Sequence, residues 1–131
     1  MNDTSARASI DTLACHRDAR GILFEPLDVE ALCRQRNAHV VLTQPGETRG
    51  NHFHRRSTEM TVVVGPCLVR LKEAGHLRDI EVPMGEAWRF TLPPGVVHAY
   101  RNTGGQVMLL ISFSSEVHDP AQPDTVREVI L

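Results

Sequence analysis

Glycine and proline turns follow one another closely along this chain, and they limit its fold more than any other feature. Turn signals stand at Pro45-Gly46, Gly65-Pro66, Ala74-Gly75, Pro83-Met84-Gly85, Pro93-Pro94-Gly95 and Asn102-Thr103-Gly104-Gly105. The segments between them predict β-strands over 40–43, 59–64, 67–73, 76–82, 87–92, 96–101 and 106–113, while the polar segment 45–51 interrupts the pattern. Strands that recur every 8–12 residues or so are typical of an antiparallel sandwich or barrel and not of an α/β fold.

The two ends of the chain depart from this pattern. We expect the polar residues 1–17 to form a flexible N-terminus and residues 18–131 to form a single domain. Residues 28–36 predict a short helix or turn with Asp28 as its N-cap. The tail over 118–131 has two prolines followed by a few apolar residues. We expect it either to pack back on the domain as an arm or to pair with another subunit.

Composition excludes several classes of protein. The chain has 131 residues and a net charge of −2, so it lacks the basic surplus of most nucleic-acid binders. No stretch approaches the roughly 18–20 apolar residues that span a bilayer, and the first ten residues lack the apolar core of a signal peptide. The three cysteines show no C-x-x-C spacing, which favours a reducing compartment. We therefore expect a cytoplasmic protein without nucleic-acid or membrane partners.

Histidine is unusually frequent, with seven histidines against six aromatic residues. His52 and His54 stand two apart and therefore face the same side of a strand. Glu59 follows closely, and His98 comes after a distant turn. Three neutral imidazoles and one carboxylate suit a divalent ion (Zn, Mn, Fe, Co or Ni) and leave a coordination position open for water or substrate. We assign no role to the other four histidines, which are His16, His39, His76 and His118.

The spacing around these four residues resembles the two motifs of the cupin superfamily. The first motif is Gly46-x5-His52-x-His54-x4-Glu59, and the second is Pro93-x-Gly95-x2-His98-x3-Asn102. The resemblance implies an all-β fold, the cupin double-stranded β-helix or jelly-roll barrel. It also implies that His52, His54, Glu59 and His98 are the metal ligands. Small cupins commonly pair through sheet edges and terminal arms, so it further implies a homodimer.

A narrower resemblance covers about residues 18–131. The stretches TRGNHFH (48–54), PPGVVHAYRNTGG (93–105) and DPAQPDT (119–125) are similar to the C-terminal cupin domain of bacterial capsular polysaccharide assembling enzymes. In that family the cupin domain epimerises C3 of a UDP-4-keto-6-deoxy sugar. The resemblance thus implies an epimerase or isomerase of a nucleotide-activated 4-keto-6-deoxy sugar, acting in polysaccharide or sugar biosynthesis.

This chemistry assigns provisional roles to further residues. The C3 proton of a 4-keto sugar is acidic, so a base is needed, and His52 or His54 could supply it in the absence of metal. A bound metal would instead polarise the ketone. Tyr100 lies two residues after His98, on the same strand face, as an acid, a sugar contact or a cap of the barrel mouth. Arg49 is a candidate for the diphosphate, or else forms a surface ion pair.

The role of Asn51 is less direct, because in a regular strand it points away from His52. We retain it as a candidate for substrate binding beside Arg49. Two other functions fit the same ligand set: a metal-dependent dioxygenase or lyase acting on a small molecule, and a cupin that binds a ligand without catalysis.

Overall fold

Antiparallel strands make up most of the ordered structure in the computed structural model, which describes residues 6–131. The elements of these residues are β1 (Ser9–Thr12), β2 (His16–Asp18), β3 (Gly21–Leu23), α1 (Val29–Cys33), β4 (Asn37–Thr43), β5 (Thr48–His54), β6 (Glu59–Val64), β7 (Cys67–Glu73), β8 (His76–Val82), β9 (Ala87–Leu92), β10 (Val97–Asn102), β11 (Met108–Ser114) and β12 (Thr125–Arg127). The predicted all-β fold is confirmed.

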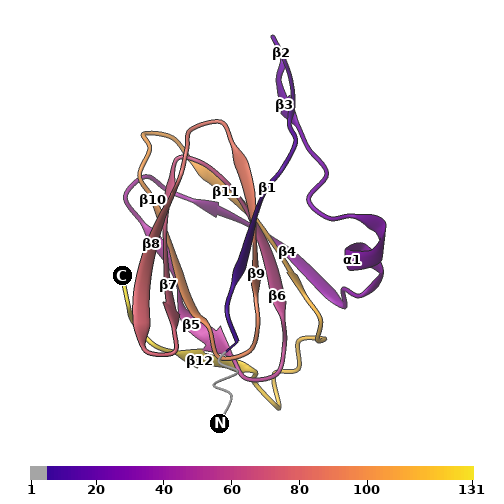
Figure 1. Cartoon of the computed structure of the whole chain (residues 1–131), viewed down its shortest axis with the longest axis vertical. Coiled ribbons are helices and arrows are strands. Elements are labelled where there is room, and N and C mark those ends of the chain that lie inside the picture. The colour runs from indigo at the N-terminus through magenta and orange to yellow at the C-terminus, as the bar shows by residue number, and fades with distance from the viewer. Residues whose placement is uncertain (1–5) are drawn as a thin grey trace.

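Two five-stranded sheets pack face to face and form the barrel (Figure 1). One sheet has the order β1-β9-β6-β11-β4 and the other the order β12-β5-β10-β7-β8. From β4 onward the chain passes repeatedly from one sheet to the other, and β7 and β8 form the one hairpin within a sheet. Consecutive strands therefore lie on opposite sides of the interior, which brings side chains from both sheets to one site.

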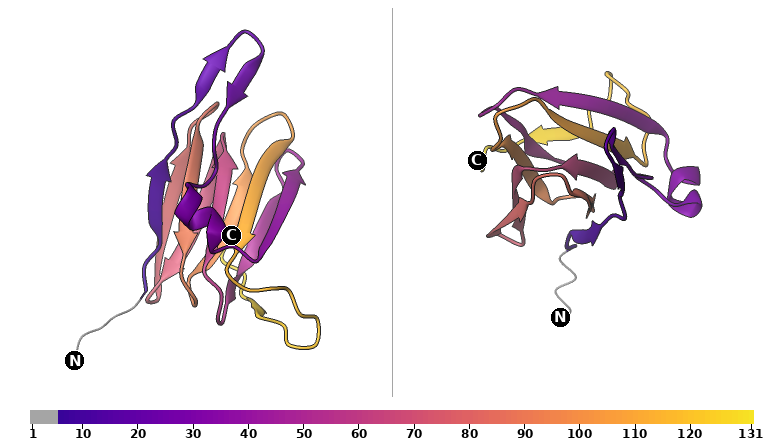
Figure 2. Two further views of the ribbon diagram at one scale, coloured as in Figure 1. Left: turned by 90° about the vertical axis from the view of Figure 1, so that its right-hand side faces the viewer. Right: turned by 90° about the horizontal axis from the view of Figure 1, so that it is seen from above.

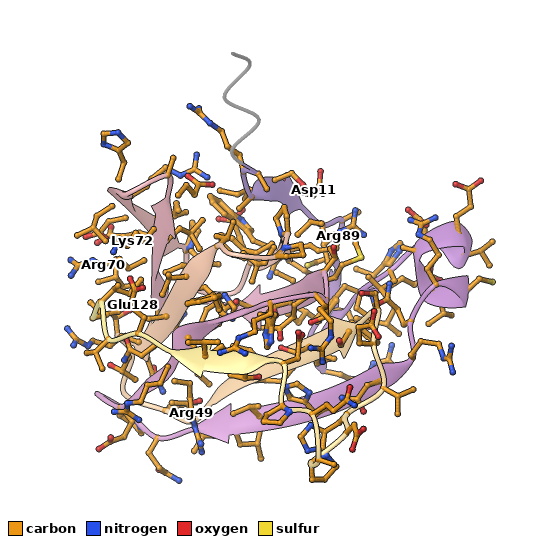
Figure 3. All side chains as sticks on the ribbon, turned by 90° about the horizontal axis from the view of Figure 1, so that it is seen from below. Asp11, Arg49, Arg70, Lys72, Arg89 and Glu128 are labelled. Atoms are coloured by element: carbon orange, nitrogen blue, oxygen red, sulfur yellow. The ribbon has the colours of Figure 1, made fainter. Side chains whose placement is uncertain are left out.

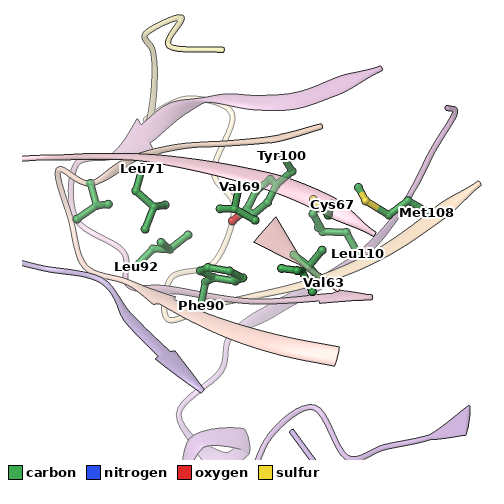
Figure 4. Packing of buried hydrophobic residues seen from close by; sticks show 11 residues of the cluster. Val63, Cys67, Val69, Leu71, Phe90, Leu92, Tyr100, Met108 and Leu110 are labelled. Atoms are coloured by element: carbon green, nitrogen blue, oxygen red, sulfur yellow. The ribbon is translucent and has the colours of Figure 1, made fainter. Parts of the chain in front are cut away.

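The core fills the space between the sheets and follows from the alternation of each strand. On β7 the side chains of Cys67, Val69 and Leu71 are buried, whereas their neighbours on the strand are only half-buried. These side chains meet Phe90 and Leu92 from β9 of the opposite sheet (Figure 4). Complete burial of a side chain of this size contributes about 1.5–3 kcal/mol, so this layer accounts for much of the stability of the barrel.

A smaller cluster lies on the outer face of the first sheet, where α1 covers part of it (Figure 2). The side chain of Asp28 accepts a hydrogen bond from Ala31 N at 2.8 Å, which confirms the predicted N-cap. The helix itself is shorter than the predicted segment 28–36. Ala31 and Leu27 are buried against Phe113 of β11. Among residues 6–131, no helix is long and apolar enough to cross a membrane.

The N-terminal part contains strands that the sequence did not indicate. Ser9–Thr12 forms β1 and pairs with β9, although only Ile10 of this strand is apolar. One apolar residue is enough because an edge strand buries a single face. The β2–β3 ribbon projects beyond the end of the barrel (Figure 1). The predicted flexibility of residues 1–17 falls partly outside the described residues, since 1–5 are not among them, and it stays a prediction.

Most of the predicted strands agree with the structure, and β6, β7, β8 and β9 have the predicted bounds. The prediction that 45–51 interrupts the strands is wrong in part, because β5 already begins at Thr48. Gly50 and Asn51, which resemble turn residues in the sequence, instead lie within this strand. The tail packs back on its own barrel, where β12 pairs with β5. This confirms the first of the two expectations for the tail.

Candidate functional site

An irregularity in β5 determines which side chains enter the barrel. The pairing of β5 with β10 shifts register between His52 and Gly50. Gly50 and Asn51 have φ angles of 90° and 57°, in the left-handed region. This bulge inserts an extra residue and restores the alternation beyond it. As a result Arg49 and His52, three residues apart, both line the same cavity.

The second histidine motif is joined to the first by the turn that precedes β10. Gly95 N donates a hydrogen bond to His54 O at 2.9 Å, so the Pro93-Pro94-Gly95 turn is tied to the end of β5. His98 then lies opposite His52 in the antiparallel register. The ring centroids are 4.7 Å apart for His52 and His98 and 5.1 Å apart for His52 and His54. The structure thus brings together the three imidazoles that the sequence analysis singled out.

Glu59 approaches the imidazoles from the opposite sheet, as the first residue of β6. Its Oε2 lies 2.7 Å from His54 Nε2, and its Oε1 lies 3.6 Å from His98 Nε2. Oε1 also accepts a hydrogen bond from Thr61 Oγ1 at 2.8 Å, and Thr61 Oγ1 lies 2.8 Å from Ser112 Oγ. These hydroxyl groups fix the carboxylate, so that it presents its oxygens to the histidines.

These four side chains fit a divalent metal ion. Their ligand atoms all lie within 4.8 Å of one another. His98 Nδ1 is 3.0 Å from Val96 O, and since a carbonyl can only accept, Nδ1 carries the hydrogen and Nε2 has a free lone pair. His98 Nε2 is buried and has no hydrogen-bond partner among the residues that the structure describes. A buried, unpaired imidazole nitrogen beside a carboxylate and two further imidazoles is the donor set that zinc and related ions require.

The surroundings of the four titratable groups shift their pKa values in different directions. Burial lowers the pKa of His98 to about 4 and also lowers that of His52. Burial alone would raise the pKa of Glu59, but the hydrogen bond from His54 and the nearby imidazoles lower it to about 2. Burial likewise opposes protonation of His54, yet the interaction with Glu59 outweighs it and raises the His54 pKa. The carboxylate is therefore ionised, while the buried imidazole of His98 stays neutral.

A cavity of about 510 Å³ opens above this centre, between the β4 edge of one sheet and the β12 edge of the other. Tyr100 lines it from within the barrel, on the same face of β10 as His98, at a centroid distance of 5.8 Å. The side chain is 3 % exposed, so Tyr100 lies inside the barrel and does not cap its mouth. Its hydroxyl is buried and has no hydrogen-bond partner in the described part of the chain, and burial raises the pKa of Tyr100 well above the usual value. Tyr100 therefore presents a neutral hydroxyl.

Of the two residues predicted to bind substrate, Arg49 lines the cavity and Asn51 does not. Arg49 is exposed and lines the cavity, and it forms no ion pair with any residue in 6–131. In Figure 3 it lies apart from the labelled ion pairs. Asn51 is not among the cavity-lining residues, because its carboxamide hydrogen-bonds the backbone of Ile130 and Leu131. The structure thus brings Arg49 to the site and directs Asn51 to the tail.

The structure also adds residues to the site that the sequence analysis missed. His39 faces the cavity from β4, opposite Ser112 of β11. Thr125 lines the cavity from β12, and Asp124 precedes it. His39 lies just before the predicted strand 40–43, so the period of two through Val41 could have placed it inward. No local pattern indicated that the tail would reach His54.

Comparisons with known proteins agree with this geometry. The chain is 28% identical over 113 residues to a UDP-2-acetamido-2,6-beta-L-arabino-hexul-4-ose reductase of Pseudomonas aeruginosa, covering 84% of this chain and 30% of that protein. It is 26% identical to the capsular polysaccharide assembling protein CapF of Staphylococcus aureus, with a TM-score of 0.67 over 90% of this chain and 34% of that one. The chain thus spans about a third of the length of these two relatives.

A third similarity covers a protein of comparable length. The sugar 3,4-ketoisomerase QdtA of Thermoanaerobacterium thermosaccharolyticum, solved in complex with TDP, shares the fold at a TM-score of 0.68. The match covers 92% of this chain and 88% of that one at 18% identity. The expected cupin jelly roll is confirmed by this similarity. Residues 16–126 match the family described as the polysaccharide biosynthesis C-terminal domain, and the chain belongs to this family.

Proposed function

We propose that this protein is an epimerase or isomerase of a nucleotide-activated 4-keto-6-deoxy sugar. The observation that carries the proposal is the position of the four-residue centre, at the inner end of a cavity that is also lined by Arg49, whose guanidinium forms no ion pair within residues 6–131. A guanidinium matches the oxygens of a diphosphate. Two likenesses support this substrate class: QdtA is a sugar ketoisomerase in complex with TDP, and CapF assembles capsular polysaccharide.

The proposed reaction begins with loss of the proton at C3, next to the ketone at C4. A divalent ion held by His52, His54, Glu59 and His98 would supply a Lewis acid for the ketone oxygen. Return of a proton to the other face of C3 gives epimerisation. Delivery of that proton to C4, with transfer of the C3 hydroxyl proton to the former ketone oxygen at C4, gives keto-isomerisation. Tyr100 lines the cavity and keeps a neutral hydroxyl, which supports it as the candidate proton donor.

The base depends on whether the imidazoles hold a metal. Without metal, His52 or His54 can accept the C3 proton, as the sequence predicts. With metal, the ligand nitrogens are occupied. His39 then remains as the one cavity-lining histidine in the described part of the chain that belongs to no ligand set. We therefore add His39 to the catalytic candidates.

Solvent exchange tests the proposed reaction. The protein is incubated in deuterated water with UDP- and with dTDP-4-keto-6-deoxy sugars, and the sugars are analysed by mass spectrometry and NMR. Deuterium is expected at C3 of at least one of them. If no such sugar exchanges with any of the candidate metals present, the proposal fails.

A metal-dependent dioxygenase or lyase is the second candidate, because three imidazoles and one carboxylate with an open position also suit iron chemistry. Oxygen consumption that requires Fe(II) would favour this function. Binding of a nucleotide sugar without exchange or turnover would instead favour a non-catalytic cupin. The homodimer and the cytoplasmic location stay predictions, and sedimentation analysis would test the first.

A further inference from the structure

The tail supplies part of the wall behind the site. We call residues 124–131 the C-terminal strap. Its strand β12 pairs with β5, with Thr125 opposite His54. Farther along, Glu128 forms an ion pair with Lys72 at 2.7 Å, and Arg70 donates a hydrogen bond to Ile130 O at 3.0 Å. These labelled side chains lie together along the tail in Figure 3. The strap is thus held at several points along its length.

Its first residue, Asp124, is bound to the turn that follows His54. The carboxylate accepts hydrogen bonds from Arg56 N at 2.7 Å, Ser57 N at 3.2 Å and Ser57 Oγ at 2.5 Å. The backbone carbonyl of Asp124 accepts another from Arg55 N at 2.9 Å. These bonds fix the start of the strap relative to the end of β5.

The strap meets the side of the His54 ring that faces away from the centre. His54 Nε2 lies 2.7 Å from Glu59 Oε2, so Nε2 points toward the other ligands. His54 Nδ1 lies 3.3 Å from Thr125 Oγ1 and 3.8 Å from Asp124 Oδ2. A histidine that binds a metal through Nε2 carries its hydrogen on Nδ1, and this N–H needs an acceptor.

We propose that Thr125 is a positioning residue for His54. Its hydroxyl accepts a hydrogen bond from His54 Nδ1–H and so keeps Nε2 aimed at the centre, while Asp124 holds Thr125 in place and adds a carboxylate behind the ring. Val96 O has the same role for His98. The inference rests on the metal centre of the proposed function, and it extends the site to a segment remote in sequence from both histidine motifs.

The decisive variant is Thr125→Val, which keeps the shape and the backbone pairing of β12 but removes the acceptor. Thr125→Ser restores the hydroxyl, and Thr91→Val provides a matched change on β9, which contributes no residue to the lining of the cavity. Zinc affinity is measured for all three by competition with a chelator. We expect Thr125→Val to bind zinc at least about tenfold more weakly, because loss of such a partner typically costs 10–100-fold. Thr125→Ser and Thr91→Val should bind close to wild type.

A second readout does not depend on metal. The exchange of the His54 Nδ1 proton with water is followed by NMR, in the zinc-loaded protein and, without zinc, at a pH where the His54 imidazole is protonated on both nitrogens. A hydrogen bond to Thr125 should slow this exchange in the wild type and in Thr125→Ser, and the protection should be lost in Thr125→Val. Unchanged zinc affinity together with unchanged proton exchange in Thr125→Val would overturn the positioning role. A wild-type protein that binds no zinc would instead refute the metal centre, while the proton exchange would still decide the role of the strap.

Discussion

Replacement of Gly50 by alanine perturbs the site through the backbone alone. Gly50 lies in the bulge of β5 at a φ of 90°. A Cβ atom built there would lie 2.6 Å from His98 O and 3.1 Å from Ala99 Cα. Both contacts are with the backbone of β10, which cannot rotate away as a side chain can. The added methyl group therefore forces β5 and β10 apart between the two histidine motifs.

The loss of stability expected for Gly50→Ala has two parts. An L-residue in the left-handed region costs about 1–2 kcal/mol. An extra carbon that displaces packed neighbours costs about 1–3 kcal/mol more. We therefore expect Gly50→Ala to lower the free energy of unfolding by about 2–5 kcal/mol, a large fraction of the stability of an ordinary domain. Since His52 follows two residues later and pairs with His98, zinc affinity should fall as well.

Gly75→Ala is the matched control. Gly75 has a φ of 79° in the turn between β7 and β8, and a Cβ atom there would meet nothing within 4 Å. This variant has the backbone strain without the close contact to a neighbouring strand. Its free energy of unfolding should therefore fall by only about 1–2 kcal/mol, and its zinc affinity should be unchanged. Urea unfolding of the metal-free proteins measures both losses. If Gly50→Ala were no less stable than Gly75→Ala, the reasoning from close approach would be refuted.

Three further changes probe the centre and its rim. His98→Ala should abolish bound metal, and full occupancy by metal analysis would exclude His98 as a ligand. The second change is a fall in pH. The pKa of His98 is lowered from 6.5 to about 4 in the folded protein, so as the pH falls the unfolded chain binds a proton at His98 before the folded protein does. The metal-free protein should therefore lose about 3 kcal/mol of stability between pH 6.5 and pH 4. Urea unfolding across this range should show a smaller loss in His98→Gln, and an equal loss would contradict the assignment. Arg49→Ala should weaken UDP binding roughly 10–100-fold in calorimetry, since a charge-assisted hydrogen bond contributes about 1.5–3 kcal/mol; wild-type affinity would place the diphosphate elsewhere.

The sequence alone predicts most strands of the barrel and the convergence of the three imidazoles, because both depend on local signals. The turns on either side of β6 to β9 determine the bounds of these strands, and in β7 the period of two also determines the buried face. His52 and His54 share a face by the same rule. β1 has only Ile10 as an apolar residue, so its period carries no information, and its place depends on pairing with β9.

The contribution of the tail could not be predicted because it depends on contacts between residues about 70 positions apart. Thr125 and Asp124 reach His54 only once β12 has paired with β5. The sequence left open whether the tail would pack on its own domain or on another subunit. Neither the prolines nor the short apolar run of the tail indicates which residue of β5 each tail residue would pair with. The position of the Thr125 hydroxyl behind His54 is therefore seen only in the folded chain.

Asn51 shows why the bulge and the strap belong together. Among non-glycine residues, asparagine is one of the few that adopt a positive φ readily, so it suits the second position of the bulge. The same conformation directs its carboxamide away from the cavity, where it accepts hydrogen bonds from Ile130 N and Leu131 N. The bulge aims His52 inward, and the strap held by Asn51 passes behind His54. Asn51, which the sequence suggested for substrate binding, thus joins the bulge that orients His52 to the strap that orients His54. Its replacement should therefore disturb both histidines at once.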